Sequence, residues 1–162
     1  RLERALLDDV ADGEQASLLV WGDPSLYDST LRLVDAVVGR GLVAIDRHVV
    51  PGLSSVQLLA ARHGIVLHDV GGSVLITTGR RLAAEGMPDG VDDVVVMLDG
   101  DTSFTSLVGR GLEIYWGAYV GMPEEILIAG PLDDVADEVV ATRAEAKAKH
   151  GWVFDIYLLR RR

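Results

Sequence analysis

The sequence contains no cysteine, and this absence excludes several classes of protein. A disulfide scaffold, a zinc site built on thiolates and a cysteine nucleophile all require that side chain. Basic residues are also scarce, with 15 lysines and arginines against 25 aspartates and glutamates, and the formal net charge is −10. Because binding to nucleic acid draws on clustered cations that displace counterions from phosphates, this charge argues against a nucleic-acid partner.

Long apolar runs are missing as well. None approaches the ~20 residues that a membrane-spanning helix needs, and the opening segment RLER is not a signal peptide. We therefore expect a cytoplasmic protein with no membrane partner. The four histidines show no spacing typical of zinc ligands, so no metal is expected. The chain of 162 residues is 49% hydrophobic and 25% charged, which is the composition of one ordinary globular domain or two small ones.

The first half of the chain alternates between helical and strand patterns. Apolar residues recur every three or four positions in some segments, and short runs apolar on both faces separate them. The expected helices cover residues 1–12, 25–38 and 54–64, and the expected strands cover residues 17–21 and 42–50. This alternation predicts an α/β fold with a doubly wound parallel sheet.

The second half has more strands and fewer helices. Apolar runs predict strands at residues 74–77, 94–98, 113–116, 125–128 and 152–159. One long helix is expected over residues 132–149, with aspartates in its first turn and basic residues near its end, as the helix dipole favours. We expect a second domain with a mixed sheet, and we divide the chain into residues 1–70 and 71–162.

Two loops stand where an expected strand turns into a helix. The first contains Gly22-Asp23-Pro24 and the second reads PGLSS over residues 51–55. Open α/β sheets bind ligands at the carboxyl ends of their strands, where helix N-termini offer free N–H groups. The alternative is that both are ordinary turns that cap the following helices. As a pair on neighbouring strands, they are expected to face one another at one sheet edge.

These two loops resemble those of the tetrapyrrole methylases. The resemblance continues at residues 97–100 (MLDG), 117–120 (GAYV) and 124–132 (EEILIAGPL) and extends over essentially the whole chain. It implies two α/β domains that hold S-adenosylmethionine in the cleft between them, and a homodimer. The family's opening strand and glycine-rich loop have no counterpart before Ser17, so we expect the first domain to be incomplete and the N-terminal segment to be missing.

The resemblance also implies a set of cofactor-binding residues. These are Gly22, Asp23, Pro24, Ser54, Ser55, Met97 and Ala118. Met97 departs from the family pattern, because Asp99 fills the place directly before the glycine. The alternative for Met97 is a buried strand residue.

Several stretches resemble the corrin branch of the family most closely, namely residues 20–30, 76–81, 115–119 and 150–161. This implies transfer of a methyl group to a ring carbon of precorrin-5 with hydrolytic loss of an acetyl group. The alternatives are methylation of another tetrapyrrole, or a shortened module that binds or dimerises without catalysis.

Loss of the acetyl group requires a general base that activates water. The candidates are Asp28, His48, His63 and Asp99; for His63 we favour a structural role, and Asp28 could instead cap the early helix.

The tetrapyrrole substrate carries several carboxylates, which arginines bind in a forked geometry. Arg80 and Arg81 follow the first strand of the second half and are the candidates for this contact, with a solvated charge pair as the alternative. The C-terminal arginines 160–162 are a second choice, because terminal basic residues are usually solvated or frayed.

Overall fold

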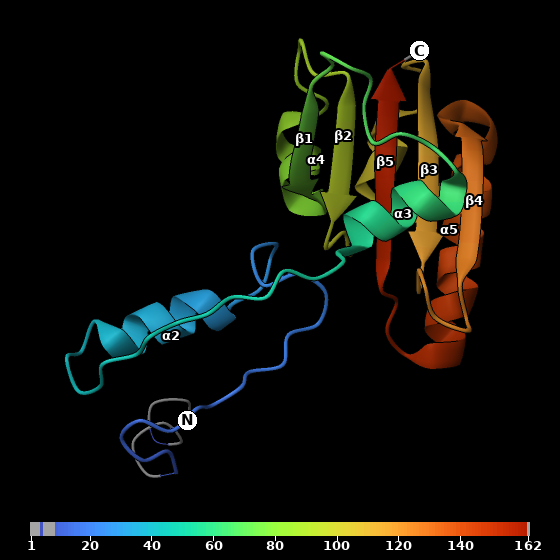
Figure 1. Cartoon of the computed structure of the whole chain (residues 1–162). Coiled ribbons are helices and arrows are strands. Elements are labelled where there is room, and N and C mark those ends of the chain that lie inside the picture. The colour runs from blue at the N-terminus through green and yellow to red at the C-terminus, as the bar shows by residue number, and fades with distance from the viewer. Residues whose placement is uncertain (1–3, 5–8, 162) are drawn as a thin grey trace. The chain divides into compact units, whose positions relative to one another are not determined.

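The computed structural model describes residue 4 and residues 9–161 of the chain (Figure 1). Most of the helix expected at residues 1–12 lies outside the described residues. The chain forms two compact units, one ending at Ser54 and the other beginning at Ser55, and each is described by itself. The second unit includes the helix that follows Ser54, because that helix packs on three strands of this unit's sheet. The expected domain division, residues 1–70 and 71–162, stays a prediction.

In the first unit, helix α2 (Thr30–Val38) confirms the later part of the helix expected at residues 25–38. Its buried residues are Val34 and Val37, one turn apart, and Gly39 ends it. The helix begins late because two aspartates bend the chain before it. Asp23 accepts a hydrogen bond from the Ser25 backbone N–H, and Asp28 accepts one from the Thr30 N–H. Such local bonds hold turns rather than a helix interior.

The two strands expected in this unit are not formed. Residues 17–21 and 42–50 carry no strand hydrogen-bonding pattern, and Leu19 and Trp21 are 100% and 82% exposed. A strand is stable only when a neighbouring strand accepts and donates its backbone hydrogen bonds. The part of this unit that the structure describes contains no other strand to serve as that neighbour. The parallel sheet expected of the first half is therefore not seen in these residues.

The second unit is built on a five-stranded mixed sheet, which confirms the five strands predicted there. The strands are β1 (Val74–Thr78), β2 (Asp93–Met97), β3 (Leu112–Ala118), β4 (Ile126–Pro131) and β5 (Asp155–Arg161). Their order across the sheet is β1-β2-β5-β3-β4. The β1–β2 pair is parallel, and the other three pairs are antiparallel.

Helices cover both faces of this sheet. Helix α3 (Ser55–His63) crosses one face, and α4 (Gly79–Glu85) and α5 (Leu132–His150) lie on the other, as Figure 1 shows. A short 3-10 helix, η1 (Ser103–Leu107), contacts α4 and α5. Helices α3 and α5 match the expected ranges within a residue or two, whereas α4 and η1 were not predicted. The α/β fold with a mixed sheet and few helices is thus confirmed for this unit.

The core lies mainly between the sheet and α5. Alternate strand residues face it, as the two-residue period of a strand requires. Its largest fully buried side chains include Trp116, Tyr157 and Phe104. The opposite face is apolar at its centre too, since Val95 and Leu158 are paired across β2 and β5 and are fully buried. The sheet is therefore covered on both faces, and its strand ends position the loops that follow them.

Candidate functional site

The two loops of the first unit lie against each other. One carboxylate oxygen of Asp23, Oδ2, accepts a hydrogen bond from the Gly52 backbone N–H at 2.9 Å. The other, Oδ1, accepts one from the Ser25 N–H at 2.8 Å and another from the Ser25 hydroxyl. These bonds, the Ser25 hydroxyl first among them, hold the pKa of Asp23 below its usual value. The expected contact between the two loops is present within this unit, although the neighbouring strands that were expected to carry them are not formed.

Glycine is needed where the two backbones meet. A Cβ atom on Gly52 would lie 2.2 Å from the carbonyl oxygen of Gly22, a distance that no side chain tolerates. Gly22 itself has a φ of +82°, in the left-handed region that favours glycine. The backbones of the two loops therefore pack directly against each other at this contact.

Ser54 and Ser55 follow this contact directly. Ser54 is buried, and Ser55 begins helix α3, whose first N–H groups have no partner within the helix. The predicted cofactor residues 22–24 and 54 thus gather on two touching loops of the first unit.

Met97 and Ala118 lie at the ends of two strands of the second unit's sheet. Met97 is the last residue of β2 and pairs with Ile156, and Ala118 is the last residue of β3 and pairs with Asp155. Because β5 runs between β2 and β3, both predicted residues lie at the same end of the sheet's strands, on either side of the start of β5. Ala118 is fully buried, whereas Met97 is half-buried, so part of its side chain is accessible.

Asp99 is the most densely bonded of the predicted residues. Its Oδ1 accepts from the Asp101 N–H at 3.1 Å and from the Ser103 hydroxyl at 2.9 Å. Its Oδ2 accepts from the Ser103 N–H at 2.7 Å and from the Tyr157 hydroxyl at 2.6 Å. The side chain also fills the space beside Gly79, where a Cβ would lie 2.3 Å from Oδ1. This network joins the end of β2 to η1, α4 and β5.

A buried ion pair beneath this loop was not predicted. Arg143 on α5 bonds Asp155 through Nε at 2.8 Å, and both side chains are nearly buried. The indole N–H of Trp116 also donates to Asp155, and Arg143 donates to the backbone carbonyl of Asp99. Burial raises the pKa of Asp155, and the Arg143 bond opposes that shift. No short-range pattern relates these residues, so the sequence alone did not indicate the pair.

The other candidate bases occupy different settings. Asp28 accepts a hydrogen bond from the Thr30 N–H at the start of α2, which lowers its pKa. His48 is exposed. The Nε2 of His63 lies 3.0 Å from the Trp116 carbonyl, which can only accept, so Nε2 carries the hydrogen. Burial lowers the pKa of His63. This bond to the Trp116 carbonyl supports the structural role favoured for His63, which stays a prediction.

Arg80 and Arg81 lie in helix α4 and not in a loop after β1. Both are exposed, and Arg81 forms an ion pair with Glu85 one turn further on, at 2.9 Å. Helix α4 begins at Gly79, which packs directly against Asp99. Their predicted role as carboxylate ligands stays a prediction.

The C-terminal arginines within the described range are ordered, contrary to the expectation of a frayed end. Arg160 forms an ion pair with buried Asp93 at 2.6 Å and donates to the carbonyl of Val66. Arg161 donates to two further carbonyls, those of Val91 and Pro88. Both arginines find partners on neighbouring segments because β5 lies in the middle of the sheet. Arg162 lies outside the described residues.

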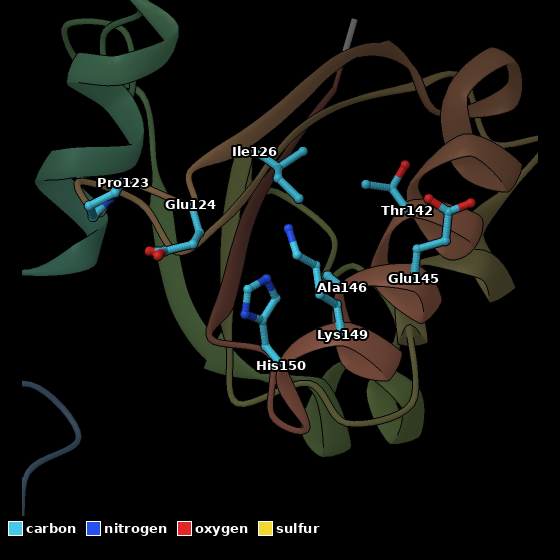
Figure 2. Close-up of a pocket in the computed structure, with 8 residues that line it drawn as sticks. All are labelled: Pro123, Glu124, Ile126, Thr142, Glu145, Ala146, Lys149 and His150. Atoms are coloured by element: carbon cyan, nitrogen blue, oxygen red, sulfur yellow. The ribbon is translucent and has the colours of Figure 1, made fainter.

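A hollow of 380 Å³ lies between α5 and the turn before β4 (Figure 2). Its lining is mixed in charge, with Glu124 and Glu145 alongside Lys149 and His150. None of the predicted site residues lines it. Over the described part of the chain, no group of three acidic or histidine side chains is placed to hold a metal ion. Nor does any helix there combine the length and apolarity needed to cross a membrane.

Comparison with known proteins identifies the class to which this fold and these loops belong. Residues 1–136 match the model of the family described as Tetrapyrrole (Corrin/Porphyrin) Methylases, and the chain belongs to this family. Among its relatives is a precorrin-6A synthase (deacetylating) from Sinorhizobium sp., 48% identical over 159 residues. That match covers 98% of this chain and 60% of the relative, so the chain spans less than two thirds of the relative's length.

Solved structures agree with this assignment. A putative cobalamin synthesis related protein (CobF) from Corynebacterium diphtheriae matches with a TM-score of 0.89 and 35% identity, over 98% of this chain and 67% of that one. The uroporphyrin-III C-methyl transfer enzyme of Thermus thermophilus, solved with S-adenyl homocysteine, matches at a TM-score of 0.53 and 18% identity. That match covers 86% of this chain and 62% of the other, and it supports the fold alone.

Proposed function

We propose that this protein is an S-adenosylmethionine-dependent methyltransferase of cobalamin biosynthesis, which methylates precorrin-5 and releases acetate to give precorrin-6A. The observation that carries the proposal is the 48% identity to a deacetylating precorrin-6A synthase along 98% of the chain. The touching glycine loops support it, since the two segments that resemble the family's cofactor loops meet in the structure.

The residues present fit the proposed cofactor. The backbones of Gly22 and Gly52 pack against each other where their loops meet, and a Cβ atom on Gly52 would clash with the Gly22 carbonyl. Asp23 fixes the geometry of the pair through its bond to the Gly52 N–H. The proposed set of contacts is completed by Pro24, Ser54, Ser55, Met97 and Ala118.

This arrangement suits a reaction that needs positioning more than covalent help. When bound, S-adenosylmethionine supplies a methyl group already activated by a positively charged sulfur. The role of the chain is then to hold donor and acceptor in line at about 3–3.5 Å and to exclude water. Rigid backbone loops, such as those around Gly22 and Gly52, perform this task without a nucleophilic side chain.

The release of acetate requires a base, for which Asp28, His48 and Asp99 are the proposed residues. Asp99 would have to give up one of four hydrogen-bond donors before it could accept a proton from water. This occupancy favours Asp28 or His48 for the proton transfer and a positioning role for Asp99. Arg80 and Arg81 are proposed to bind substrate carboxylates, because both are exposed and cationic.

The proposal includes the setting in which the enzyme works. We place it in the cytoplasm as a homodimer acting on a small molecule, with neither nucleic acid nor membrane as partner. The net charge of −10 supports the exclusion of nucleic acid. The same charge makes exposed arginines such as Arg80 important, since they create a local positive site for an acidic substrate.

The test is a turnover experiment with the purified protein, precorrin-5 and S-adenosylmethionine labelled with ¹³C in its methyl group. We expect one labelled methyl group in the product and one acetate released per turnover, measured by mass spectrometry and NMR. Methylation of another tetrapyrrole without acetate release would point to a different member of the family. Binding of S-adenosylhomocysteine without any turnover would indicate a non-catalytic module and contradict the proposal.

A further inference from the structure

The hollow beside helix α5 takes no part in the proposed reaction, yet its volume of 380 Å³ is that of a small-molecule site. Its second wall is the turn before β4 together with Ile126, the first residue of that strand. Its first wall is one face of the last two turns of α5, where the lining residues recur at spacings of three and four: Thr142, Glu145, Ala146, Lys149 and His150. A single helix face thus stands opposite the start of an edge strand.

Both walls of the hollow are fixed by contacts outside it. In the turn, Glu125 accepts hydrogen bonds from Nε of Arg62 at 2.7 and 2.9 Å and from the Gly121 N–H at 2.7 Å. At the end of α5, the ring of His150 packs edge-on against buried Tyr119, with ring centroids 5.3 Å apart. The hollow is therefore formed before a ligand arrives, and binding requires little ordering of the chain.

The polar side chains of the hollow do not pair with one another. Glu145 stands four residues before Lys149, a spacing at which these two residue types commonly form an ion pair on a helix. Within the part of the chain that the structure describes, this pair does not form. Figure 2 shows Lys149 and the His150 ring extending into the hollow toward Ile126, whereas Glu145 lies to one side, next to Thr142. Opposite charges thus stand apart around one space.

The balance of charge around the hollow indicates the class of ligand. A simple anion drawn to Lys149 would also meet the carboxylates of Glu124 and Glu145, and a simple cation drawn to them would meet the lysine. A ligand that carries both charges avoids both repulsions. Ile126 and Ala146 add apolar surface between the charged groups, which favours an aliphatic portion in the same ligand.

We propose that this hollow is a binding site for a zwitterionic α-amino acid with an aliphatic side chain. Lys149 and the His150 ring bind its carboxylate. Glu145 binds its ammonium group, with the Thr142 hydroxyl beside it, and the aliphatic side chain packs on Ile126. The inference is independent of the proposed function, because none of the proposed cofactor or substrate residues lines the hollow.

Titration of the ¹⁵N-labelled protein with leucine, followed by NMR, tests the site. We expect saturable shifts of the Ile126 and Ala146 amide signals, with a dissociation constant on the order of 1 mM or lower. Two analogues of the same shape separate the charges, since 4-methylpentanoate lacks the ammonium group and 3-methylbutylamine lacks the carboxylate. Each should bind at least about tenfold more weakly than leucine, because a charge-assisted bond is lost and a like charge of the protein is left unopposed.

Three variants at exposed positions of α5 locate the bound leucine. Lys149→Met and Glu145→Gln should each weaken its binding about tenfold. The matched control is Lys147→Met, which removes a lysine from the same helix turn outside the hollow and should bind leucine like the native protein. All three should keep the native urea midpoint, so a weaker affinity is not a consequence of unfolding.

Three results would overturn the inference. The first is the absence of saturable shifts with leucine up to about 10 mM. The second is binding of 4-methylpentanoate as tightly as leucine, which would define a site for anions alone. The third is equal affinity of the native protein, Lys149→Met and Glu145→Gln, which would place the ligand elsewhere. Each result leaves the proposed function standing, since that function is tested by turnover of S-adenosylmethionine.

Discussion

Replacement of Gly79 by alanine tests the network around Asp99 most sharply. The added Cβ would lie 2.3 Å from Oδ1, 2.4 Å from Cγ and 2.5 Å from Cβ of Asp99. Both residues are buried, and four hydrogen bonds hold the carboxylate, so neither side can retreat freely. Either the junction of β1 and α4 moves away from the loop after β2, or the carboxylate loses at least one donor.

The size of the effect follows from these two costs. Overpacking of a tight core costs about 1–3 kcal/mol, and loss of a hydrogen bond to a charged group costs about 1.5–3 kcal/mol. We expect Gly79→Ala to lower the free energy of unfolding by about 4 kcal/mol. Urea unfolding followed by circular dichroism measures it as a lower midpoint with an unchanged slope.

The matched control is Gly100→Ala, next to Asp99 in sequence. No heavy atom lies within 4 Å of its added Cβ, and its stability should stay within about 0.5 kcal/mol of the native value. If Gly79→Ala were as stable as Gly100→Ala, the close packing described for Asp99 would be refuted.

Two further predictions concern the ionisable groups of the second unit. Burial lowers the pKa of His63, so below pH 6.5 the unfolded chain binds more protons than the folded one, and stability should fall as the pH drops from 7 to 5. In urea unfolding, His63→Gln should lose less stability than the native protein across that range. Equal losses would contradict the lowered pKa of His63. Arg143→Met leaves buried Asp155 without its cation and should lower the free energy of unfolding by about 3–5 kcal/mol at pH 7. The matched variant Arg81→Met breaks an exposed pair and should lower it by less than about 1 kcal/mol. Similar losses of stability for both variants in thermal unfolding would show that the buried pair is not important.

The sequence predicted the elements whose formation depends on local pattern. The strands of the second unit and helix α5 were found because apolar runs, and a helix with an acidic first turn and a basic last turn, are visible in a short window. Helix α4 was missed because it begins at Gly79, a weak helix former, and its position depends on packing against Asp99. The prediction of strands at residues 17–21 and 42–50 was wrong, because an apolar run cannot form a strand without a neighbouring strand to share its backbone hydrogen bonds.

The site was predictable in its motifs and not in its connections. The contact between Asp23 and Gly52 could be anticipated, because two strand-to-helix loops were expected at one edge. Asp99 was proposed as a base from its place in a loop, but its bond to Tyr157 joins residues 58 positions apart. Arg160 was expected to fray, and it is held by Asp93 from the neighbouring strand. Long-range contacts of this kind leave no periodic pattern in the sequence.

The most direct test of the central claim is calorimetric titration of the protein with S-adenosylhomocysteine, for the native chain and two glycine variants. Gly52→Ala places a Cβ 2.2 Å from the Gly22 carbonyl, whereas Gly39→Ala adds the same methyl group in the same unit at a helical φ of −61°. We predict that the native chain and Gly39→Ala bind with equal affinity and that Gly52→Ala binds at least about tenfold more weakly. No binding by the native chain, or equal binding by Gly52→Ala, would contradict the claim that these two loops hold the cofactor.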